Sequence, residues 1–568
     1  MQSDSRLNEL HRDPPDAIIV GSGATGGWAA KELAEAGLRV VVLDAGPLTT
    51  PDQFGEHVPP YELKYRDNRP NGVASPEIAR SRPMHAKQGA CSEVNYRWFA
   101  NDVENPFTTP PGKPFVWVRV RAVGGRSLVW GRQSYRLSDL DFKAASRDGI
   151  GVDWPVNHAG MAPYYAKVER FIGISGRAEG LAHFPDGEFL PPMEFNCGER
   201  ILKESVERSF GRPVTIGRSA VLTSPLQGRA ACHYCGPCNR GCATYSYFSS
   251  PFSTLAAASQ TGLLTVFPDA VVSHVTTDPA SGLASGVAYF DRLTRRPREL
   301  RSKVVVLCAS TLESTRILLN SAPWGLGNSS GMLGRYLMDH MYGATVSGRL
   351  PKLGRARPWH GPPRRPNGIF IPRFRNVDRS HTNGVFRGFS YQGGASPRFA
   401  TASPGFGRSF KRAVHEDAFW QVGVHAFSEC LPSFDNFVDL DPGVVDAWGI
   451  PVLRIHMRWS DNELALFADS LEEGAAMLEA AGAVDIRTAE APKVPGDGIH
   501  EVGTARMGAD PKSSVLNAHC QAHDVKNLFV TDGAAFPSLG SVNPTLTMMA
   551  NTVRACEHIV QAARRLEI

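Results

Sequence analysis

The chain has 568 residues, a formal net charge of +5 and 21% charged residues, and it is too long for a single hydrophobic core, so at least two structural domains are expected. Basic residues are spread along the chain, which gives no support for nucleic-acid binding. No run of 18 or more apolar residues occurs, so no transmembrane segment is predicted. The polar segment 1–16 lacks the apolar core of a secretory signal. We therefore expect a cytoplasmic protein, or one exported to the periplasm together with a partner that carries the signal.

A complete βαβ unit is predicted near the amino terminus. An apolar strand at 16–20 leads into the sequence GSGATGG at 21–27, and a helical pattern follows at 28–37. A second apolar strand at 38–43 ends at Asp44. A glycine-rich turn between the first strand and the helix is typical of dinucleotide binding.

Each glycine of this turn has its own predicted role. Gly21 permits the tight turn, Gly23 lets a pyrophosphate approach the backbone, and Gly26 allows the helix to pack closely on the strand. The helix amino terminus would stabilise the phosphates, and Asp44 would accept hydrogen bonds from the adenosine ribose. FAD and NAD use the same turn, so this motif alone does not choose between them.

Further pieces of a nucleotide-binding domain are predicted far downstream. An apolar strand at 303–308 precedes a helix at 312–320, another strand falls at 527–530, and a long final helix begins at about Pro544. The intervening chain must therefore form a second domain threaded through the first. Within it, residues 351–375 are rich in Pro, Arg and Gly and are predicted to form a long loop.

Four of the ten cysteines lie close together, with the C-x2-C-x2-C-x3-C spacing of Cys232, Cys235, Cys238 and Cys242. Bacterial ferredoxins use this run for iron–sulfur clusters, although Ala243 stands where a proline customarily follows. A zinc site of four thiolates is the main alternative, but structural zinc usually pairs its ligands across a longer gap. We favour an iron–sulfur cluster.

Two further regions carry a family resemblance. One is VGGRSLVWG at 123–131, and the other comprises HEVGTARMG at 500–508, TDG at 531–533 and SVNPTLT at 541–547. Together with the glycine-rich turn they resemble the glucose–methanol–choline (GMC) oxidoreductase family. The resemblance is strongest to the pyranose oxidase and sugar dehydrogenase branch, because Asn543 stands where relatives of glucose oxidase carry a second histidine.

The resemblance implies an α/β fold, in which a GMC-type FAD-binding, Rossmann-like domain carries an inserted α+β substrate domain with an antiparallel sheet. We assign the FAD-binding domain to residues 14–155, 215–335 and 495–568, with the iron–sulfur segment at 228–245. The substrate domain is assigned to residues 156–214 and 336–494.

The resemblance also implies bound FAD, with His500 as the catalytic base and Asn543 as its hydrogen-bonding partner. In pyranose oxidases a histidine two residues after the serine of the Gly-Gly loop bonds covalently to the flavin. Val129 stands there, so non-covalent FAD is expected. The residues expected to contact the cofactor are Gly21, Gly23, Gly26, Asp44, Gly124, Gly125, Ser127, Asp532, Gly533, Pro544 and Thr545.

The chemistry also follows from the residue types. Removing a hydride from an alcohol carbon requires that the hydroxyl proton leave too, and a neutral imidazole such as that of His500 can take it at physiological pH. Asn543 can hold the same oxygen in line. It also precedes Pro544, however, and could instead cap the final helix.

We expect oxidation of a pyranose ring hydroxyl, C3 of a glucoside in particular. Gln392 is a candidate substrate contact, although a turn or a strand end is the simpler interpretation of this residue. Related bacterial sugar dehydrogenases add a cysteine-ligated [3Fe-4S] cluster, which implies electron flow to a cytochrome c-type acceptor and a small partner subunit. Two alternatives stay open: an oxygen-reducing oxidase with a structural metal site, and a non-catalytic electron-transfer subunit.

Overall fold

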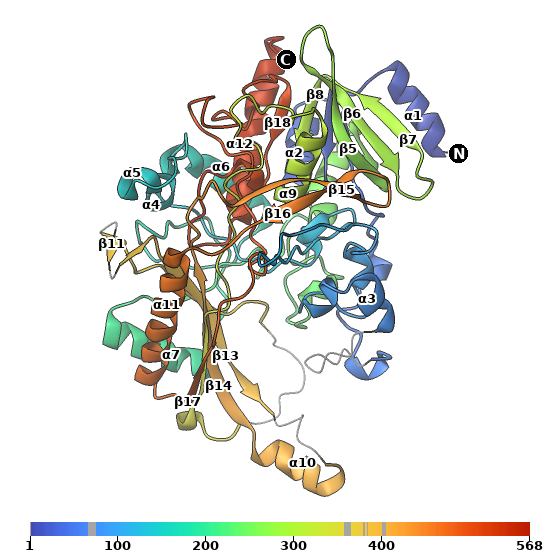
Figure 1. Cartoon of the computed structure of the whole chain (residues 1–568). Coiled ribbons are helices and arrows are strands. Elements are labelled where there is room, and N and C mark those ends of the chain that lie inside the picture. Colours follow the sequence, from blue (N-terminus) through green and yellow to red (C-terminus); the bar gives the residue numbers. More distant parts are fainter. Residues whose placement is uncertain (1, 66–74, 357–364, 379–380, 383, 400–404) are drawn as a thin grey trace.

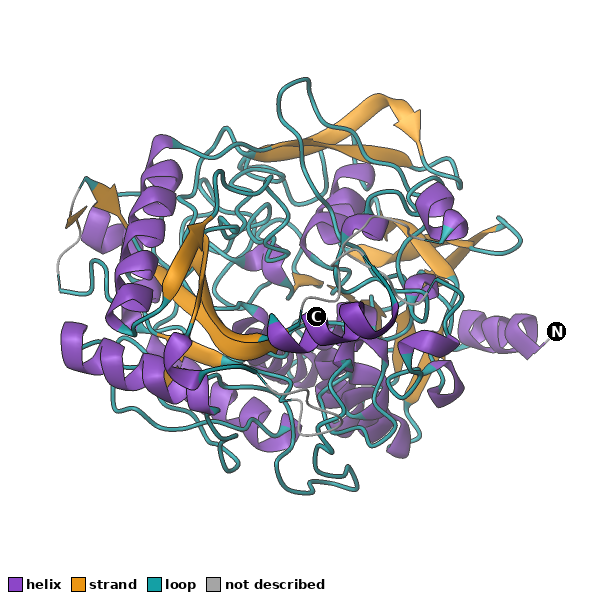
Figure 2. Cartoon of the chain, turned by 90° about the horizontal axis from the view of Figure 1, so that it is seen from below, coloured by secondary structure: helices purple, strands orange, loops and turns teal. Residues whose placement is uncertain are grey.

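Two β-sheets organise the molecule, one parallel and one antiparallel (Figure 1). The computed structural model describes residues 2–65, 75–356, 365–378, 381–382, 384–399 and 405–568. Seen from below, much of the chain between the sheets is irregular loop (Figure 2). Among the described helices, none is long and apolar enough to span a membrane.

The parallel sheet has the strand order β18-β8-β1-β2-β4. Its strands are β1 (Ala17–Val20), β2 (Val40–Leu43), β4 (Leu264–Phe267), β8 (Val304–Leu307) and β18 (Leu528–Val530). Every residue of β1, β2, β8 and β18 is buried, which explains why these strands are continuous apolar runs without alternation. Four of the five strands were predicted from such runs. The fifth, β4, is only partly buried and was not predicted.

Helices complete this half of the molecule. Helix α2 (Ala24–Glu35) follows β1, α9 (Thr311–Asn320) follows β8, and α12 (Thr545–Arg564) follows β18. Helix α12 packs against α2 and α6 (His158–Ile172). These helices and strands confirm the predicted α/β fold with a nucleotide-binding parallel sheet.

The antiparallel sheet has the order β17-β9-β14-β13-β10-β3. Helices α7 (Cys197–Phe210) and α11 (Asp461–Ala480) pack against it. The predicted antiparallel sheet is therefore present. Its strands are β3 (Thr215–Ile216), β9 (Thr345–Arg349), β10 (Ile369–Ile371), β13 (Phe389–Arg398), β14 (Phe419–Ser428) and β17 (Val484–Thr488).

Smaller elements fill in around the two sheets. The predicted loop 351–375 contains β10, and its residues 357–364 lie outside the described part of the chain. The remaining strands are β5 (Ala270–Thr277), β6 (Ala284–Asp291), β7 (Pro297–Arg301), β11 (His381–Thr382), β12 (Val385–Phe386), β15 (Phe437–Val445) and β16 (Pro451–His456). The remaining helices are α1 (Gln2–Arg12), α3 (Pro76–Ser81), α4 (Asp139–Phe142), α5 (Ala144–Asp148), α8 (Thr254–Gln260) and α10 (Gly407–Glu416).

Candidate active site

The glycine-rich turn lies at the carboxyl edge of the parallel sheet. Gly21 has φ +95°, and a Cβ there would lie 2.4 Å from the carbonyl oxygen of Cys308. A Cβ on Gly26 would lie 1.9 Å from the carbonyl oxygen of Gly21, so both positions require glycine. At Gly23 the nearest atom would be 4.0 Å away, which leaves the backbone open. Helix α2 begins there without a side-chain cap, so its first N–H groups are available to an anion.

The Gly124–Gly125 loop lies directly against this turn. The backbone N–H of Gly124 donates to Ser22 Oγ at 2.8 Å, and a Cβ on Gly125 would lie 3.3 Å from Gly23 Cα. Ser127 donates its hydroxyl to the Gly124 carbonyl and accepts from the N–H of Ser250 at 3.0 Å. The Ser127 hydroxyl thus holds the loop in shape.

A cavity of about 2170 Å³ runs from these two loops to the antiparallel sheet. It brings together most of the predicted site residues, although Gly26 and Gly124 do not line it. The lining includes Gly21, Gly23, Asp44, Gly125, Ser127, Gln392, His500, Asp532, Gly533, Asn543, Pro544 and Thr545.

Two predicted carboxylates are buried in the cavity wall. Asp44, at the end of β2, accepts from the N–H groups of Ser22 at 3.1 Å and Gly46 at 2.9 Å, and burial raises its pKa. Asp532 accepts from the Ser314 hydroxyl at 2.5 Å, and burial raises its pKa to about 6. Asp44 is held by backbone N–H groups of neighbouring loops and Asp532 by a side chain of α9, which fixes both carboxylates at the cavity.

The histidine centre lies where the two sheets approach each other. Asn543 Nδ2 is 3.1 Å from His500 Nε2, and Gln392 Nε2 donates to Asn543 Oδ1 at 2.6 Å. On the other side of the ring, His500 Nδ1 lies 2.9 Å from His340 Nδ1. His340 Nε2 in turn lies 2.6 Å from the carbonyl oxygen of Gly540. Both nitrogens of His500 therefore have a defined partner.

Electrostatics keep this centre neutral. Desolvation, together with His340 and Arg126, holds the pKa of His500 well below its usual 6.5. Burial lowers the pKa of His340 to about 4. Asp339 accepts the backbone N–H of His500 at 2.8 Å, and burial together with Glu501 raises its pKa to about 8. A neutral His500 can accept a proton at physiological pH.

Two of the simpler interpretations of these residues are wrong. Helix α12 begins after Pro544, with no side-chain cap, so Asn543 is not a helix cap and its amide faces His500 instead. Gln392 lies inside β13, opposite His425, and neither in a turn nor at a strand end. Its side chain is buried and contacts Asn543.

The four clustered cysteines face one small cavity beside His233 and Tyr247. The N–H of Tyr234 donates to Cys232 Sγ and that of Ser246 to Cys242 Sγ, each at 3.3 Å. Burial raises the pKa of Cys232 and of Cys235 to about 11. Across the described residues, no group of three or more His, Cys, Asp or Glu side chains is arranged to hold a metal ion. The protein contacts alone therefore do not gather these thiols into a ligand set.

Sequence reasoning missed four residues of the site: Arg119, Arg121, Asp339 and His340. The two arginines alternate with apolar residues just before the Gly-Gly loop, and a charged residue at every second position of an apolar run was the available signal. Asp339 and His340 are adjacent and completely buried, but no sequence period marks them. Only the fold shows that they contact His500.

The fold and the cavity define a dinucleotide-binding α/β protein whose site extends to an antiparallel sheet. Two family models described as GMC oxidoreductase match residues 218–342 and 432–552. The chain is also 30% identical to 2-methyl-1,2-propanediol dehydrogenase of Mycolicibacterium austroafricanum, over 96% of this chain and 95% of that protein. The chain belongs to the GMC oxidoreductase family, which confirms the resemblance, and it is an oxidoreductase that acts on CH–OH groups.

Further relatives cover the chain as completely. The fructose dehydrogenase large subunit of Gluconobacter japonicus is 27% identical, over 96% of this chain and 97% of that protein. A C-glycoside 3-oxidase of Arthrobacter globiformis is 25% identical, over 96% and 95%. Among solved structures, pyridoxine 4-oxidase from Mesorbium loti has a TM-score of 0.59 at 18% identity, over 96% of this chain and 98% of that one, which shows a shared fold.

The family implies FAD, and the cavity fits that cofactor. Gly23 leaves the backbone open to a diphosphate, and Asp44 lies at the end of β2 nearby. Arg119 Nε and Arg121 Nη1 are buried at the cavity wall without a hydrogen-bond partner among the described residues. Arg121 also donates through Nη2 to Glu313 Oε1 at 3.1 Å, and the unsatisfied N–H donors that remain on these two buried guanidinium groups suit an anionic ligand.

Proposed function

We propose that this protein oxidises a ring hydroxyl of a pyranose, C3 of a glucoside in particular. The observation that carries the proposal is the pair of His500 Nε2 and Asn543 Nδ2, 3.1 Å apart at the wall of the large cavity. Support for a sugar comes from the names of two relatives, fructose dehydrogenase and C-glycoside 3-oxidase.

The lining near the antiparallel sheet also suits a sugar. Hydrogen-bonding side chains and aromatic rings alternate there, and a pyranose offers both hydroxyl groups and apolar ring faces. These residues are Glu199, Arg365, Gln392, Trp420, Gln421 and Phe427. In this proposal Gln392 contacts the substrate next to Asn543, because its amide is hydrogen-bonded to the Asn543 side chain.

In the proposed reaction His500 Nε2 takes the proton of the alcohol hydroxyl, and Asn543 holds the same oxygen. FAD, when bound, supplies the hydride acceptor at N5. Because desolvation keeps His500 neutral, its lone pair is available without prior loss of a proton. The amino-terminal end of α12, at Pro544 and Thr545, faces the cavity and would stabilise negative charge there.

Visible spectra of the purified protein, recorded anaerobically before and after adding a panel of alcohols, test the proposal. The panel holds methyl glucosides, their 3-deoxy analogues, fructose and 2-methyl-1,2-propanediol. The flavin absorbance should bleach with the glucosides and persist with the 3-deoxy analogues. Equal bleaching by the 3-deoxy compounds would move the reaction to another carbon, and bleaching by the propanediol alone would refute a sugar substrate.

We also propose that FAD is bound without a covalent link. Val129 occupies the position of the histidine that bonds the flavin in pyranose oxidases, and its side chain lines the cavity. Acid precipitation should leave all yellow colour in the supernatant. Flavin retained in the pellet would contradict the proposal.

We propose that electrons leave through an iron–sulfur cluster at Cys232, Cys235, Cys238 and Cys242, [3Fe-4S] in type, which needs only three thiolates and so leaves one of the four unligated. Three observations support it: the ferredoxin spacing, the shared small cavity, and the fact that Cys238 lines the large cavity as well. Such a cluster would pass electrons singly to a cytochrome c-type acceptor, with a small subunit as partner. One relative is named as the large subunit of fructose dehydrogenase, which is consistent with a partner.

Metal analysis of anaerobically prepared protein distinguishes the alternatives. Several irons per chain and no stoichiometric zinc are expected. One zinc and no iron would favour the oxygen-reducing oxidase with a structural metal site.

A further inference from the structure

We propose that His340 is a positioning residue that fixes the tautomer of His500, with the proton on His500 Nδ1 and the lone pair on Nε2. The inference rests on the proposed role of His500 as the base. It follows from a chain of hydrogen bonds whose direction is set by the Gly540 carbonyl at one end and matched by the amides of Gln392 and Asn543 at the other.

One end is the carbonyl of Gly540, which can only accept. His340 Nε2 lies 2.6 Å from that oxygen, so Nε2 carries the proton. The ring of His340 is completely buried and its lowered pKa leaves it a single proton near neutral pH. Its Nδ1 therefore presents a lone pair. His500 Nδ1, 2.9 Å away, must be the donor of that bond.

The other end is the amide of Gln392. Gln392 Nε2 donates to Asn543 Oδ1 at 2.6 Å, which turns the amide nitrogen of Asn543 toward His500. This nitrogen is 3.1 Å from His500 Nε2 and can only donate. His500 Nε2 must therefore accept. The orientation of the Asn543 amide thus agrees with the tautomer of His500 that the Gly540 carbonyl requires.

This tautomer is the one that the reaction needs. When the substrate O–H bond breaks, its proton forms a new bond to His500 Nε2, while Nδ1–H stays bonded to His340. Without an acceptor at His340, His500 could carry its single proton on Nε2, where it has no lone pair for the substrate. In an unrelated enzyme class, loss of the residue that orients a histidine tautomer costs about 10⁴-fold in rate.

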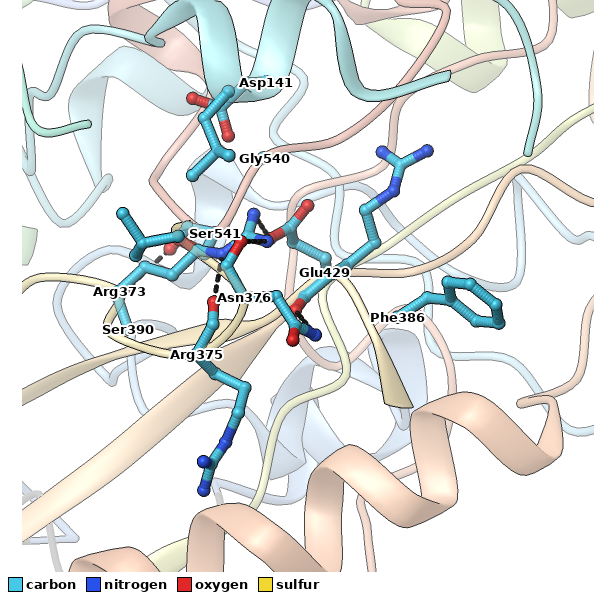
Figure 3. Close-up of polar contacts among 12 residues, drawn as sticks. Asp141, Arg373, Arg375, Asn376, Phe386, Ser390, Glu429, Gly540 and Ser541 are labelled. Atoms are coloured by element: carbon cyan, nitrogen blue, oxygen red, sulfur yellow. Dashed lines mark hydrogen bonds and ion pairs between the residues drawn. The ribbon is translucent and has the colours of Figure 1, made fainter. Parts of the chain in front are cut away.

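The loop that carries the Gly540 carbonyl is held by a second hydrogen bond. Ser390 donates its hydroxyl to the carbonyl of Ser541 (Figure 3). A Cβ on Gly540 would lie 2.6 Å from Asp141 Oδ1, so the loop is closely packed from the opposite side. The Ser390 bond holds the same loop as His340 but contacts neither histidine, which makes Ser390→Ala a matched control.

Two substitutions separate tautomer control from packing. In His340→Asn, Oδ1 takes the approximate place of the ring Nδ1 and still accepts from His500. In His340→Phe, the ring fills the space but accepts nothing. Anaerobic flavin reduction should slow by about 10- to 100-fold in His340→Phe, the cost of one buried unpaired donor. The rate should be largely rescued in His340→Asn, and Ser390→Ala should be faster than His340→Phe. A faster flavin reduction in His340→Phe than in His340→Asn would overturn the inference.

A spectroscopic measurement checks the tautomer directly. In the holoenzyme labelled with ¹⁵N-histidine, the signals of His500 are those lost in His500→Ala. They should show a protonated Nδ1 and an unprotonated Nε2, and His340→Phe should give a mixture of both tautomers. A protonated Nε2 in the native enzyme at neutral pH would refute the inference. If His500→Ala itself reduced its flavin at the native rate, the proposed function would fail instead.

Discussion

The histidine centre and the cysteine loop are the two chemically distinctive regions of this molecule, and they are organised in opposite ways. Each ring nitrogen of His500 and His340 has a protein partner at 2.6 to 3.1 Å, and Gln392 of β13 holds the Asn543 amide that is one of these partners. The four clustered cysteines share a cavity, yet the described residues hold no three-ligand group arranged for a metal.

The two regions differ in how much of the site geometry the folded chain itself provides. Hydrogen bonds between protein groups preorganise the histidine centre, so its geometry is a property of the folded chain. Thiolates repel one another, so if the four clustered cysteines bind a metal ion, that ion would gather them, because metal binding couples to local folding. Substitutions in the two regions should therefore affect different half-reactions.

The largest effect is expected for His500→Ala. Removing a general base costs about 10²- to 10⁴-fold, so anaerobic flavin reduction by the substrate should slow by that order. FAD content should stay normal, because the residues proposed to hold the cofactor are those of the glycine-rich turn, elsewhere in the cavity. Stopped-flow absorbance and the flavin-to-protein ratio measure the two quantities. A native reduction rate would require another base.

The next largest effect is expected for Asn543→Ala. The change leaves Gln392 Nε2 without its acceptor and removes the donor beside His500, so the rate should fall by about 10- to 100-fold. Asn320→Ala is a matched control, because that amide bonds backbone carbonyls at the end of α9, away from the histidines. If both variants lose only melting temperature, Asn543 has no part in the reaction.

The parallel half of the fold could be predicted because its signals are local. Strands such as β1 and β8 are buried on both faces and read as unbroken apolar runs, and the glycines at 21 and 26 are required by contacts of 2.4 Å or less. Strand β4 was not predicted because it is only partly buried. The antiparallel sheet was expected only from the family, since most of its strands pair across long sequence separations.

The same distinction between local and long-range signals applies to the candidate active site. His500 and Asn543 could be singled out from their motifs, but their orientation could not, because it depends on His340 and Gln392, which are 160 and 151 residues away in sequence. The interpretation of Asn543 as a helix cap failed for the same reason. The local pattern of Asn before Pro placed the start of α12 to within one residue, but the Asn543 side chain is held by Gln392 of the distant strand β13.

A smaller effect concerns pH. The pKa of His500 lies well below 6.5, and the base form is the deprotonated one, so it is fully present above that folded pKa. The rate of flavin reduction should therefore stay constant between pH 7 and pH 6. A histidine of ordinary pKa would lose about threefold over that interval. Stopped-flow rates at saturating substrate test this, and an acid limb near pH 6.5 would show that His500 is solvated.

The smallest effect on flavin reduction is expected for Cys235→Ser. Cys235 faces the small cavity and not the large one, so the rate of reduction by the substrate should be unchanged. If the cysteines hold a cluster, the same variant should lose iron, and electron transfer to a one-electron acceptor should fall while reduction of the flavin does not. Cys197→Ser is the matched control, because that thiol is exposed and lies outside the cluster. Equal rates of acceptor reduction in both variants, with iron lost only from Cys235→Ser, would remove the cluster from the electron path. A slowed flavin reduction in Cys235→Ser alone would mean that the histidine centre and the cysteine loop are coupled through the shared cavity wall. The contrast drawn between the two regions would then no longer hold.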